Sequence, residues 1–330
     1  MKILSKIHSN QRRLIEILRI IDEVDKPIGA RAISDALCIR GYDLGERAVR
    51  YNLKILDELG FTEKQGYSGR ALTYRGIKEL NDALVNDRIG FVNTRIEEYI
   101  YRTTFDPWTA KGNVVANVST VRKADYEKAR DVMTEAFEAG CTVSKRVLVM
   151  DEGEGKERYE IPEGSLGIIT VCSITLDGAL LNRGIPINTS YAGVVDVKEK
   201  VPLGFTDLIA YSGSSIDPMK VFCSRKVTRI SEALRGLPGR ILANVREVPV
   251  SAESAVREII EQCSRAGIDG LIKVSEPGEA TLECPVSQGK IGIALCAGVN
   301  AAAVASELGV DIRTSPISAI VDYSRMGEMR

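Results

Sequence analysis

The first eighty residues carry apolar positions at the spacing of amphipathic helices, followed by a short alternating stretch. We expect three helices, over residues 10–23, 30–37 and 46–59. Gly60 follows the third helix in the position of a left-handed cap. Residues 61–72 then alternate around Gly66 and Gly69, a pattern typical of a two-stranded hairpin. Three helices and a hairpin predict a winged helix-turn-helix domain over residues 1–82.

The third predicted helix has a basic face. Its apolar stripe is formed by Val49, Leu53, Leu56 and Leu59. A helix fits the major groove of DNA, where Arg and Lys contact guanine edges or phosphates, and the hairpin can reach the adjacent backbone. The predicted DNA-binding residues are Arg47, Arg50, Tyr51 and Lys54 on the helix, and Lys64, Ser68 and Arg70 on the hairpin. A merely solvated helix face, or a winged helix that contacts protein, stays open as an alternative.

Residues 83–330 are expected to form a regulatory domain that contains an internal repeat. A helix containing Ile96 and Tyr99 is predicted within residues 81–112. Beyond it, six short segments recur in the same order at offsets of about 125 residues; NVVANVSTV at 113–121, for example, matches RILANVREV at 240–248. LGIITVCS, with Cys172, likewise matches IGIALCAG, with Cys296.

Each repeat, about 113–197 and 240–323, predicts a strand, a helix, a strand, a loop, a strand with a cysteine, a helix-like stretch and a strand. The first repeat is followed by an insertion over 198–239. The predicted fold class is α+β, an N-terminal winged helix-turn-helix followed by a duplicated α/β two-lobed regulatory domain with pseudo-twofold symmetry. A cleft on the axis, lined by equivalent residues of both halves, is the expected ligand site.

Polar residues follow the cysteine-bearing strands. Cys172, Ser173 and Thr175 precede a loop rich in Gly, Asn, Thr and Ser, whose N–H and hydroxyl groups could hold a small anion. The corresponding loop of the second repeat begins with Cys296, Gly298 and Asn300. Further candidates are the glycine-hydroxyl cluster at 212–215 and three arginines that could neutralise a carboxylate, Arg183, Arg225 and Arg313. Ordinary packing of the cysteines and ordinary turns are the competing interpretation.

The residue composition excludes several classes of catalytic and metal site. His8 is the sole histidine, which argues against Ser/His/Asp triads, Cys/His dyads and HExxH zinc sites, so we expect no enzyme and no metal. Seven cysteines without a CxxC pair favour reduced thiols, and neither nucleotide-binding glycine motif occurs. No apolar run is long enough for a membrane span or a secretion signal, so a cytoplasmic protein without a membrane partner is expected. Residues 1–80 hold 15 Lys and Arg against 11 Asp and Glu, which favours a nucleic-acid-binding front end.

GARAISDALCIRGYDLGERAVRYNLKILDELGFTEKQGYSGR, with GIITVCSITLDGALLNRGIP and GIALCAGVNAAAVA, resembles the nitrogen regulatory repressor family, NrpR, of methanogenic archaea, over nearly the whole chain. The resemblance implies a homodimeric repressor of nitrogen-fixation and nitrogen-assimilation genes that binds inverted-repeat operators in double-stranded DNA. It implies no cofactor, but 2-oxoglutarate as the allosteric effector that lowers operator affinity. Cys172 occupies the family's inducer-response motif, TVCSIT. The effector-binding residues expected on this basis are Cys172, Ser173, Thr175, Asn182, Thr189, Ser190, Cys296 and Thr314.

The best-known members of that family carry two regulatory domains in tandem, and this chain has room for one. The resemblance therefore leaves two arrangements open: the chain pairs with a second chain that carries an NrpR domain, or it acts alone. In either case the general transcription machinery at the promoter is an expected partner. Two alternatives stay open: a DNA-binding subunit that leaves effector sensing to its partner chain, and a winged helix fused to an enzyme with Cys172 or Cys296 as nucleophile.

Overall fold

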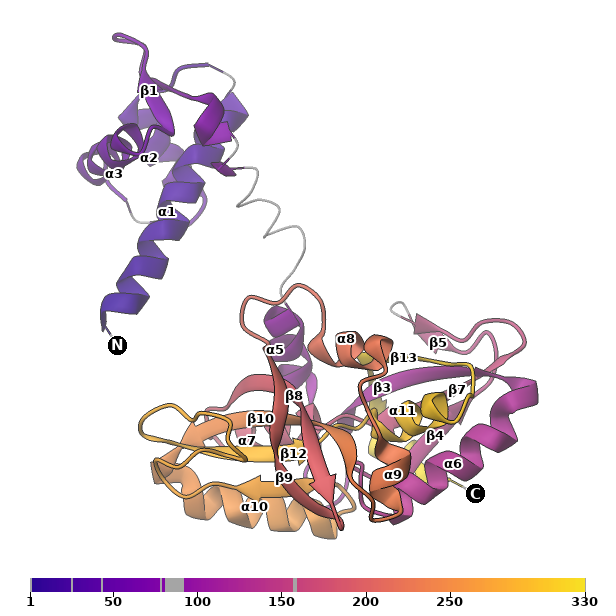
Figure 1. Cartoon of the computed structure of the whole chain (residues 1–330). Helices are drawn as coiled ribbons and strands as arrows, with labels where there is room; N and C mark the ends of the chain where they lie inside the picture. Colours follow the sequence, from indigo (N-terminus) through magenta and orange to yellow (C-terminus); the bar gives the residue numbers. More distant parts are fainter. Residues whose placement is uncertain are drawn as a thin grey trace. The chain divides into compact units, whose positions relative to one another are not determined.

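The computed structural model describes residues 2–24, 26–42, 44–77, 79–80, 92–156 and 159–329 (Figure 1). The chain divides into two compact units, Met1–Gly90 and Phe91–Arg330. The expected domain boundary at residue 82 and the first part of the helix expected within 81–112 lie outside the described residues. Within those residues, no helix combines the length and the apolar character that crossing a membrane requires.

The first unit is the predicted winged helix-turn-helix. Its elements are α1 (Lys2–Val24), α2 (Ala30–Ile39), α3 (Glu46–Glu58), β1 (Thr62–Lys64) and β2 (Arg70–Leu72). The helices pack around a core that includes Ile17, Ile33 and Leu53. α1 begins eight residues earlier than predicted, because residues 2–9 contain neither Gly nor Pro to stop the helix. The class of the unit is confirmed.

Two glycines fix the join between α3 and the wing. Gly60 has φ +74°, and the N–H of Phe61 donates to the carbonyl of Leu56 at 2.9 Å, which completes the predicted left-handed cap. Gly69 has φ +119°, and a Cβ there would lie 2.2 Å from the carbonyl oxygen of Ile28. The glycine therefore lets Ile28 pair with the second wing strand.

The second unit is built from the two predicted repeats. The first contains β3 (Asn113–Arg122), α6 (Tyr126–Glu138), β4 (Arg146–Met150), β7 (Ser165–Val171), α7 (Ile174–Leu181) and β8 (Asn188–Lys198). The second contains β10 (Gly239–Pro249), α10 (Glu253–Arg265), β11 (Leu271–Val274), β12 (Lys290–Cys296), α11 (Asn300–Glu307) and β13 (Ile312–Asp322). The α+β duplication is confirmed.

Elements outside the duplicated pattern complete the unit. They are α5 (Val92–Arg102), β5 (Gly155–Lys156), β6 (Tyr159–Glu160), β9 (Val201–Ala210), α8 (Pro218–Arg225), α9 (Ile230–Leu234) and β14 (Gly327–Glu328). Short 3₁₀ turns occupy Lys123–Asp125, Val250–Ala252 and Tyr323–Arg325.

The two repeats exchange their last helix and strand. One sheet has the order β13-β3-β7-β4-β14 and the other β11-β12-β10-β8-β9, so β8 and β13 each join the sheet of the opposite repeat. The last helix of each repeat is exchanged as well, since α7 packs on α10 of the second repeat and α11 packs on α6 of the first. The hydrophobic pattern predicted the elements but not this exchange, because it contains no information about pairing partners.

Strand register corrects the predicted equivalence of the two cysteines. Val171 pairs with Ala116 of β3, and Cys296 pairs with Ala243 of β10, the counterpart of Ala116. Cys296 therefore corresponds to Val171, and Cys172 corresponds to Ala297, the residue after Cys296. A shift of one residue along a strand turns a side chain to the opposite face, so the cysteines are not symmetry mates.

A packed cluster, rather than the expected ligand cleft, brings equivalent residues of the two repeats together near the pseudo-twofold axis. Equivalent residues of the repeats meet in one cluster, in the pairs Val115 with Leu242, Ile174 with Val299 and Ala192 with Ile317. The same cluster contains side chains of α5 and α8, elements that have no counterpart in the other repeat. These added helices bury the axial surface that the duplication alone would leave open.

Candidate functional sites

The predicted basic face of α3 is exposed. Arg47, Arg50, Tyr51 and Lys54 are exposed, with Tyr51 at 68%, whereas Val49, Leu53 and Leu56 are buried beneath them. Arg50 donates from Nε and Nη2 to the Glu46 carboxylate at 3.1 and 2.5 Å. Exposed pairs of this i,i+4 type contribute only about 0.3–0.5 kcal/mol, so a phosphate can displace the carboxylate at little cost.

The wing presents some of its predicted residues and retains another for its own structure. Lys64 and Ser68 are exposed, as is Tyr67 at the tip. Arg70 is only 22% exposed, and its Nε donates to both oxygens of Asp57 at 3.1 and 2.8 Å. Arg70 therefore holds the wing against α3, a role that the sequence pattern did not reveal.

Ser173 and Thr175, the predicted effector residues at the start of α7, are buried and bonded within the protein. Thr175 Oγ1 accepts from the N–H of Val115 at 3.0 Å and donates to the Val115 carbonyl at 3.1 Å. Asn300, its counterpart, bonds Leu242 in the same two ways at 3.0 and 2.9 Å. These side chains fasten a helix to the start of a strand in each repeat.

A buried ion pair lies next to these residues and was missed by sequence reasoning. Arg246 on β10 donates to Asp177 on α7, and neither side chain is exposed at all. Thr189 donates to Asp177 at 2.7 Å, and Arg246 also donates to Asn244 at 2.6 Å. Burial raises the pKa of Asp177, and the positive charge of Arg246 opposes that rise. An Asp inside the apolar segment ITLDGALL was the available signal.

The eight predicted effector residues do not form one site. Ser173, which donates to Asn244 at 3.1 Å, and Thr189 contact the cluster around Arg246. Asn182 instead donates to the Thr103 carbonyl at 3.0 Å, and the Thr314 hydroxyl lies 3.0 Å from that of Ser119. The Ser190 hydroxyl accepts from Asn188, and Cys172 and Cys296 are buried in two different apolar clusters.

Native thiol reactivity should separate the exposed cysteine from the buried ones. Burial raises the pKa of Cys172 to about 12 and that of Cys296 still further, so both stay protonated and shielded. With a thiol reagent at pH 8, we expect rapid labelling of exposed Cys38 and labelling of Cys172 and Cys296 only after denaturation. Stability from the buried neutral thiols is present below their ordinary pKa of 9.0 and is lost as the pH rises toward 12. Rapid labelling of folded Cys172 would contradict this and favour a nucleophile.

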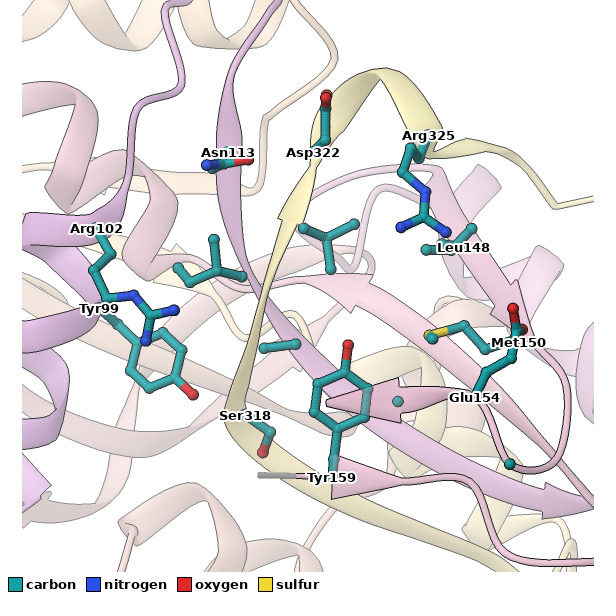
Figure 2. A pocket seen from close by; sticks show the side chains of 15 residues that line it. Tyr99, Arg102, Asn113, Leu148, Met150, Glu154, Tyr159, Ser318, Asp322 and Arg325 are labelled. Carbon is teal, nitrogen blue, oxygen red and sulfur yellow. The ribbon is translucent and has the colours of Figure 1, made fainter. Parts of the chain in front are cut away.

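Two neighbouring cavities open beside β13 in the regulatory unit. The larger, of about 850 Å³, has Tyr99 and Arg102 of α5 on one side and Tyr159 and Glu154 on the other (Figure 2). Its charged groups are mixed, since Glu154 and Asp322 accompany Arg102 and Arg325. Its polar character therefore favours no ligand of one charge.

The second cavity, of about 600 Å³, shares Tyr159 and Ser318 with the first. Three cations line it: Arg95 of α5, Lys220 of α8 and Arg313 of β13. Arg95 bonds Asp217 at 3.0 Å. The sequence had pointed to Arg313 and Ser215, which line this cavity, but not to Arg95 or Lys220. Across the described residues, no three His, Cys, Asp or Glu side chains lie together as a metal site.

Comparisons with known proteins match both units. The family described as NrpR regulatory domains NRD1 and 2 matches residues 89–328, and the ribonuclease R winged-helix domain matches residues 15–80. The global nitrogen regulator NrpRI of Methanosarcina mazei is 47% identical over 319 residues, which are 97% of this chain and 98% of that protein. The global nitrogen regulator NrpR of Methanococcus maripaludis is 34% identical over 94% of this chain.

The match to the Methanococcus maripaludis protein covers 54% of that protein, so this chain spans about half of its length. The crystal structure of a nitrogen repressor-like protein from Methanococcus jannaschii superposes with a TM-score of 0.63, over 73% of this chain and 99% of that one. The two sequences are 23% identical, so this likeness supports the fold alone.

Proposed function

The chain belongs to the NrpR family of nitrogen regulators, and on that premise we propose that it is a transcriptional repressor of nitrogen-fixation and nitrogen-assimilation genes. It binds inverted-repeat operators as a dimer and is released by 2-oxoglutarate. The observation that carries the proposal is the exposed basic face of α3 beside an exposed wing. That arrangement matches a recognition helix in the major groove with a wing at the backbone.

A dimer explains the inverted repeat. Two copies related by a twofold axis present two α3 helices, whose half-sites lie one DNA turn, about 34 Å, apart. An effector that binds one state of the regulatory unit more tightly shifts the dimer away from this spacing. The general transcription machinery is the target that an occupied operator would block.

Two alternatives differ in where sensing occurs. In the first, the chain binds DNA and a second chain with an NrpR domain senses the effector, which is compatible with its spanning half of one longer relative. In the second, the regulatory unit is a cysteine-dependent enzyme, but the raised pKa of Cys172 and the names of the relatives both oppose this.

Titration onto a labelled inverted-repeat promoter fragment, with and without millimolar 2-oxoglutarate, tests the proposal. We expect tight binding that weakens about tenfold with the ligand, which corresponds to a coupling free energy of about 1.4 kcal/mol. Binding that ignores the ligand would leave the DNA role standing and assign sensing to the partner chain. No binding to any such fragment would remove the repressor function.

Cys172→Ala should leave operator affinity intact but blunt the response to 2-oxoglutarate. Cys172 packs in the axial cluster with α5 and α8, so its loss loosens the helices that the effector must move. Cys263→Ala is the matched control, because Cys263 on α10 is also buried, with a pKa likewise raised to about 12. The same operator titration, with and without 2-oxoglutarate, measures the response of both variants. A normal response of Cys172→Ala would return this residue to ordinary packing.

A further inference from the structure

The duplication places a protein carboxylate at one of two equivalent positions and a cavity at the other. Glu247 of β10 pairs across the sheet with Asn188 of β8. The equivalent pair in the other sheet is Thr120 of β3 with Arg313 of β13. Both pairs join the first strand of one repeat to the exchanged last strand of the other, so their surroundings can be compared residue by residue.

The Glu247 carboxylate occupies a fully formed site. The side chain is 4% exposed and accepts from the Ser287 N–H at 2.7 Å and the Ser287 hydroxyl at 3.1 Å. Asn188 and Lys290 donate to it at 3.3 and 3.4 Å. Burial alone would raise the pKa of Glu247, but the hydrogen bonds from Ser287 and Asn188 and the charge of Lys290 hold it below its ordinary value. This half of the domain stabilises a carboxylate with its own side chain.

The other half lacks that side chain and keeps the space. Thr120 replaces Glu247, Pro162 replaces Ser287, and Arg313 replaces Asn188. All three replacing residues line the cavity of about 600 Å³. A neutral amide has thus been exchanged for a guanidinium, and the acidic side chain has been removed. The net effect is a positively charged opening at the place where the other repeat buries a negative charge.

The charges around the opening are incompletely compensated. Among the described residues, no carboxylate pairs with Arg313 or Lys220. Arg95 bonds Asp217 through one nitrogen, while its Nε is buried without a hydrogen-bond partner. Glu160 is the other acidic residue of the lining, so three cations face two carboxylates. A buried unpartnered donor and two free cations favour an anionic ligand.

We propose that this cavity binds a small dicarboxylate. One carboxylate takes the place that Glu247 fills in the other repeat, bound by Arg313 and the hydroxyls of Thr120 and Ser315. The other carboxylate lies toward Lys220 and Arg95. The cavity volume falls within the ordinary range for small-molecule sites, about 300–1,000 Å³. In assigning this ligand a regulatory role, the inference rests on the proposed function.

The cavity also has a path to regulation. Arg95 lies on α5, the first described helix of the regulatory unit, and the residues just before α5 lead to the winged helix. Lys220 lies on α8, which packs on β8 and β13, the two exchanged strands. A ligand that bridges these elements binds one arrangement of them better than another, which is the differential affinity that induction requires.

Calorimetric titration of the full chain tests the site. The probes are 2-oxoglutarate and glutarate, both dicarboxylates, and 2-oxopentanoate, which has the same chain length and one carboxylate. We expect the dicarboxylates to bind and 2-oxopentanoate to bind at least about tenfold more weakly. Arg313→Gln should weaken dicarboxylate binding about tenfold or more, because it removes a charge-assisted hydrogen bond. Arg265→Gln, at an exposed arginine of α10 that pairs with Glu261 away from the cavity, should bind normally.

Thr120→Glu is the second variant. It supplies the missing side chain opposite Arg313, so it should abolish dicarboxylate binding and lower operator affinity without ligand. Thermal unfolding verifies that each variant is folded. If Thr120→Glu does not fold, the binding measured for Arg313→Gln alone tests the cavity.

The outcomes separate this site from the proposed function. If the wild type binds 2-oxoglutarate and Arg313→Gln binds it equally well, the cavity assignment is wrong while the proposed function stands. Dicarboxylate binding that depends on Arg313 but leaves operator affinity unchanged supports the cavity and removes the effector from the proposed function. A wild type that binds no dicarboxylate overturns the site.

Discussion

Replacing Arg246 by methionine should lower the free energy of unfolding of the regulatory unit by about 3–5 kcal/mol. The change leaves the Asp177 carboxylate fully buried without its cation, retaining only the hydrogen bond from Thr189 among its charge-stabilising side-chain partners. The loss should be smaller in acid than at neutral pH. Burial raises the pKa of Asp177, so the neutral form relieves the penalty at low pH, and stability falls as the pH rises through the raised value.

Urea denaturation, monitored by tryptophan fluorescence, measures this loss of unfolding free energy. Trp108 is the sole tryptophan of the chain and lies in the regulatory unit, so the signal reports on that unit. The double variant Arg246→Met with Asp177→Leu should recover much of the lost stability, because a buried pair exchanged for apolar residues leaves no orphan charge. An unchanged urea midpoint for Arg246→Met would show that Asp177 finds water or another donor.

Arg50→Ala should weaken binding to the operator fragment by about tenfold or more without unfolding the protein. Arg50 lies on the exposed face of α3, and one base or phosphate contact of this kind contributes about 1–3 kcal/mol. If Arg50 contacts phosphate, the dependence of log affinity on log salt should become shallower by about one unit. Fluorescence anisotropy at several salt concentrations measures both quantities.

Arg257→Ala is the matched control for Arg50→Ala. Arg257 on α10 also bonds a glutamate one turn earlier through Nε and Nη2, at 2.9 and 2.8 Å. Each substitution thus removes an arginine that bonds a glutamate one helical turn before it, but only Arg50 belongs to the predicted interface. Equal affinity of both variants and the wild type would remove Arg50 from the DNA-binding surface.

The sequence predicted those parts of the fold whose cause is local. Helical periodicity located α2 and α3, and the conformational freedom of glycine predicted the cap at Gly60, since both depend on neighbouring residues. The repeat was also visible, because equivalent strands keep similar residues. The exchange of β8 and β13 was not, since strand pairing is decided by tertiary packing.

The candidate site residues also separate into those that local sequence predicts and those that depend on tertiary packing. Exposure of Arg47 and Lys54 follows from the apolar stripe of α3, and the structure shows it. The sequence comparison treated Cys172 and Cys296 as equivalent because both are cysteines. The strand register shows that the equivalent of Cys296 is Val171, the residue before Cys172. Arg95 and Lys220 come from α5 and α8, which have no counterpart in the other repeat. An internal comparison could not have found them.

The exchanged strands also constrain how the protein is made. β3 becomes an interior strand of its sheet only when β13, some two hundred residues later in the chain, has paired with it. A nascent chain emerging from the ribosome therefore cannot complete either sheet from the first repeat alone, and it carries an open strand edge until the second repeat has been synthesised. A single repeat translated as a separate polypeptide would close its sheet only by lending its last strand to a second copy.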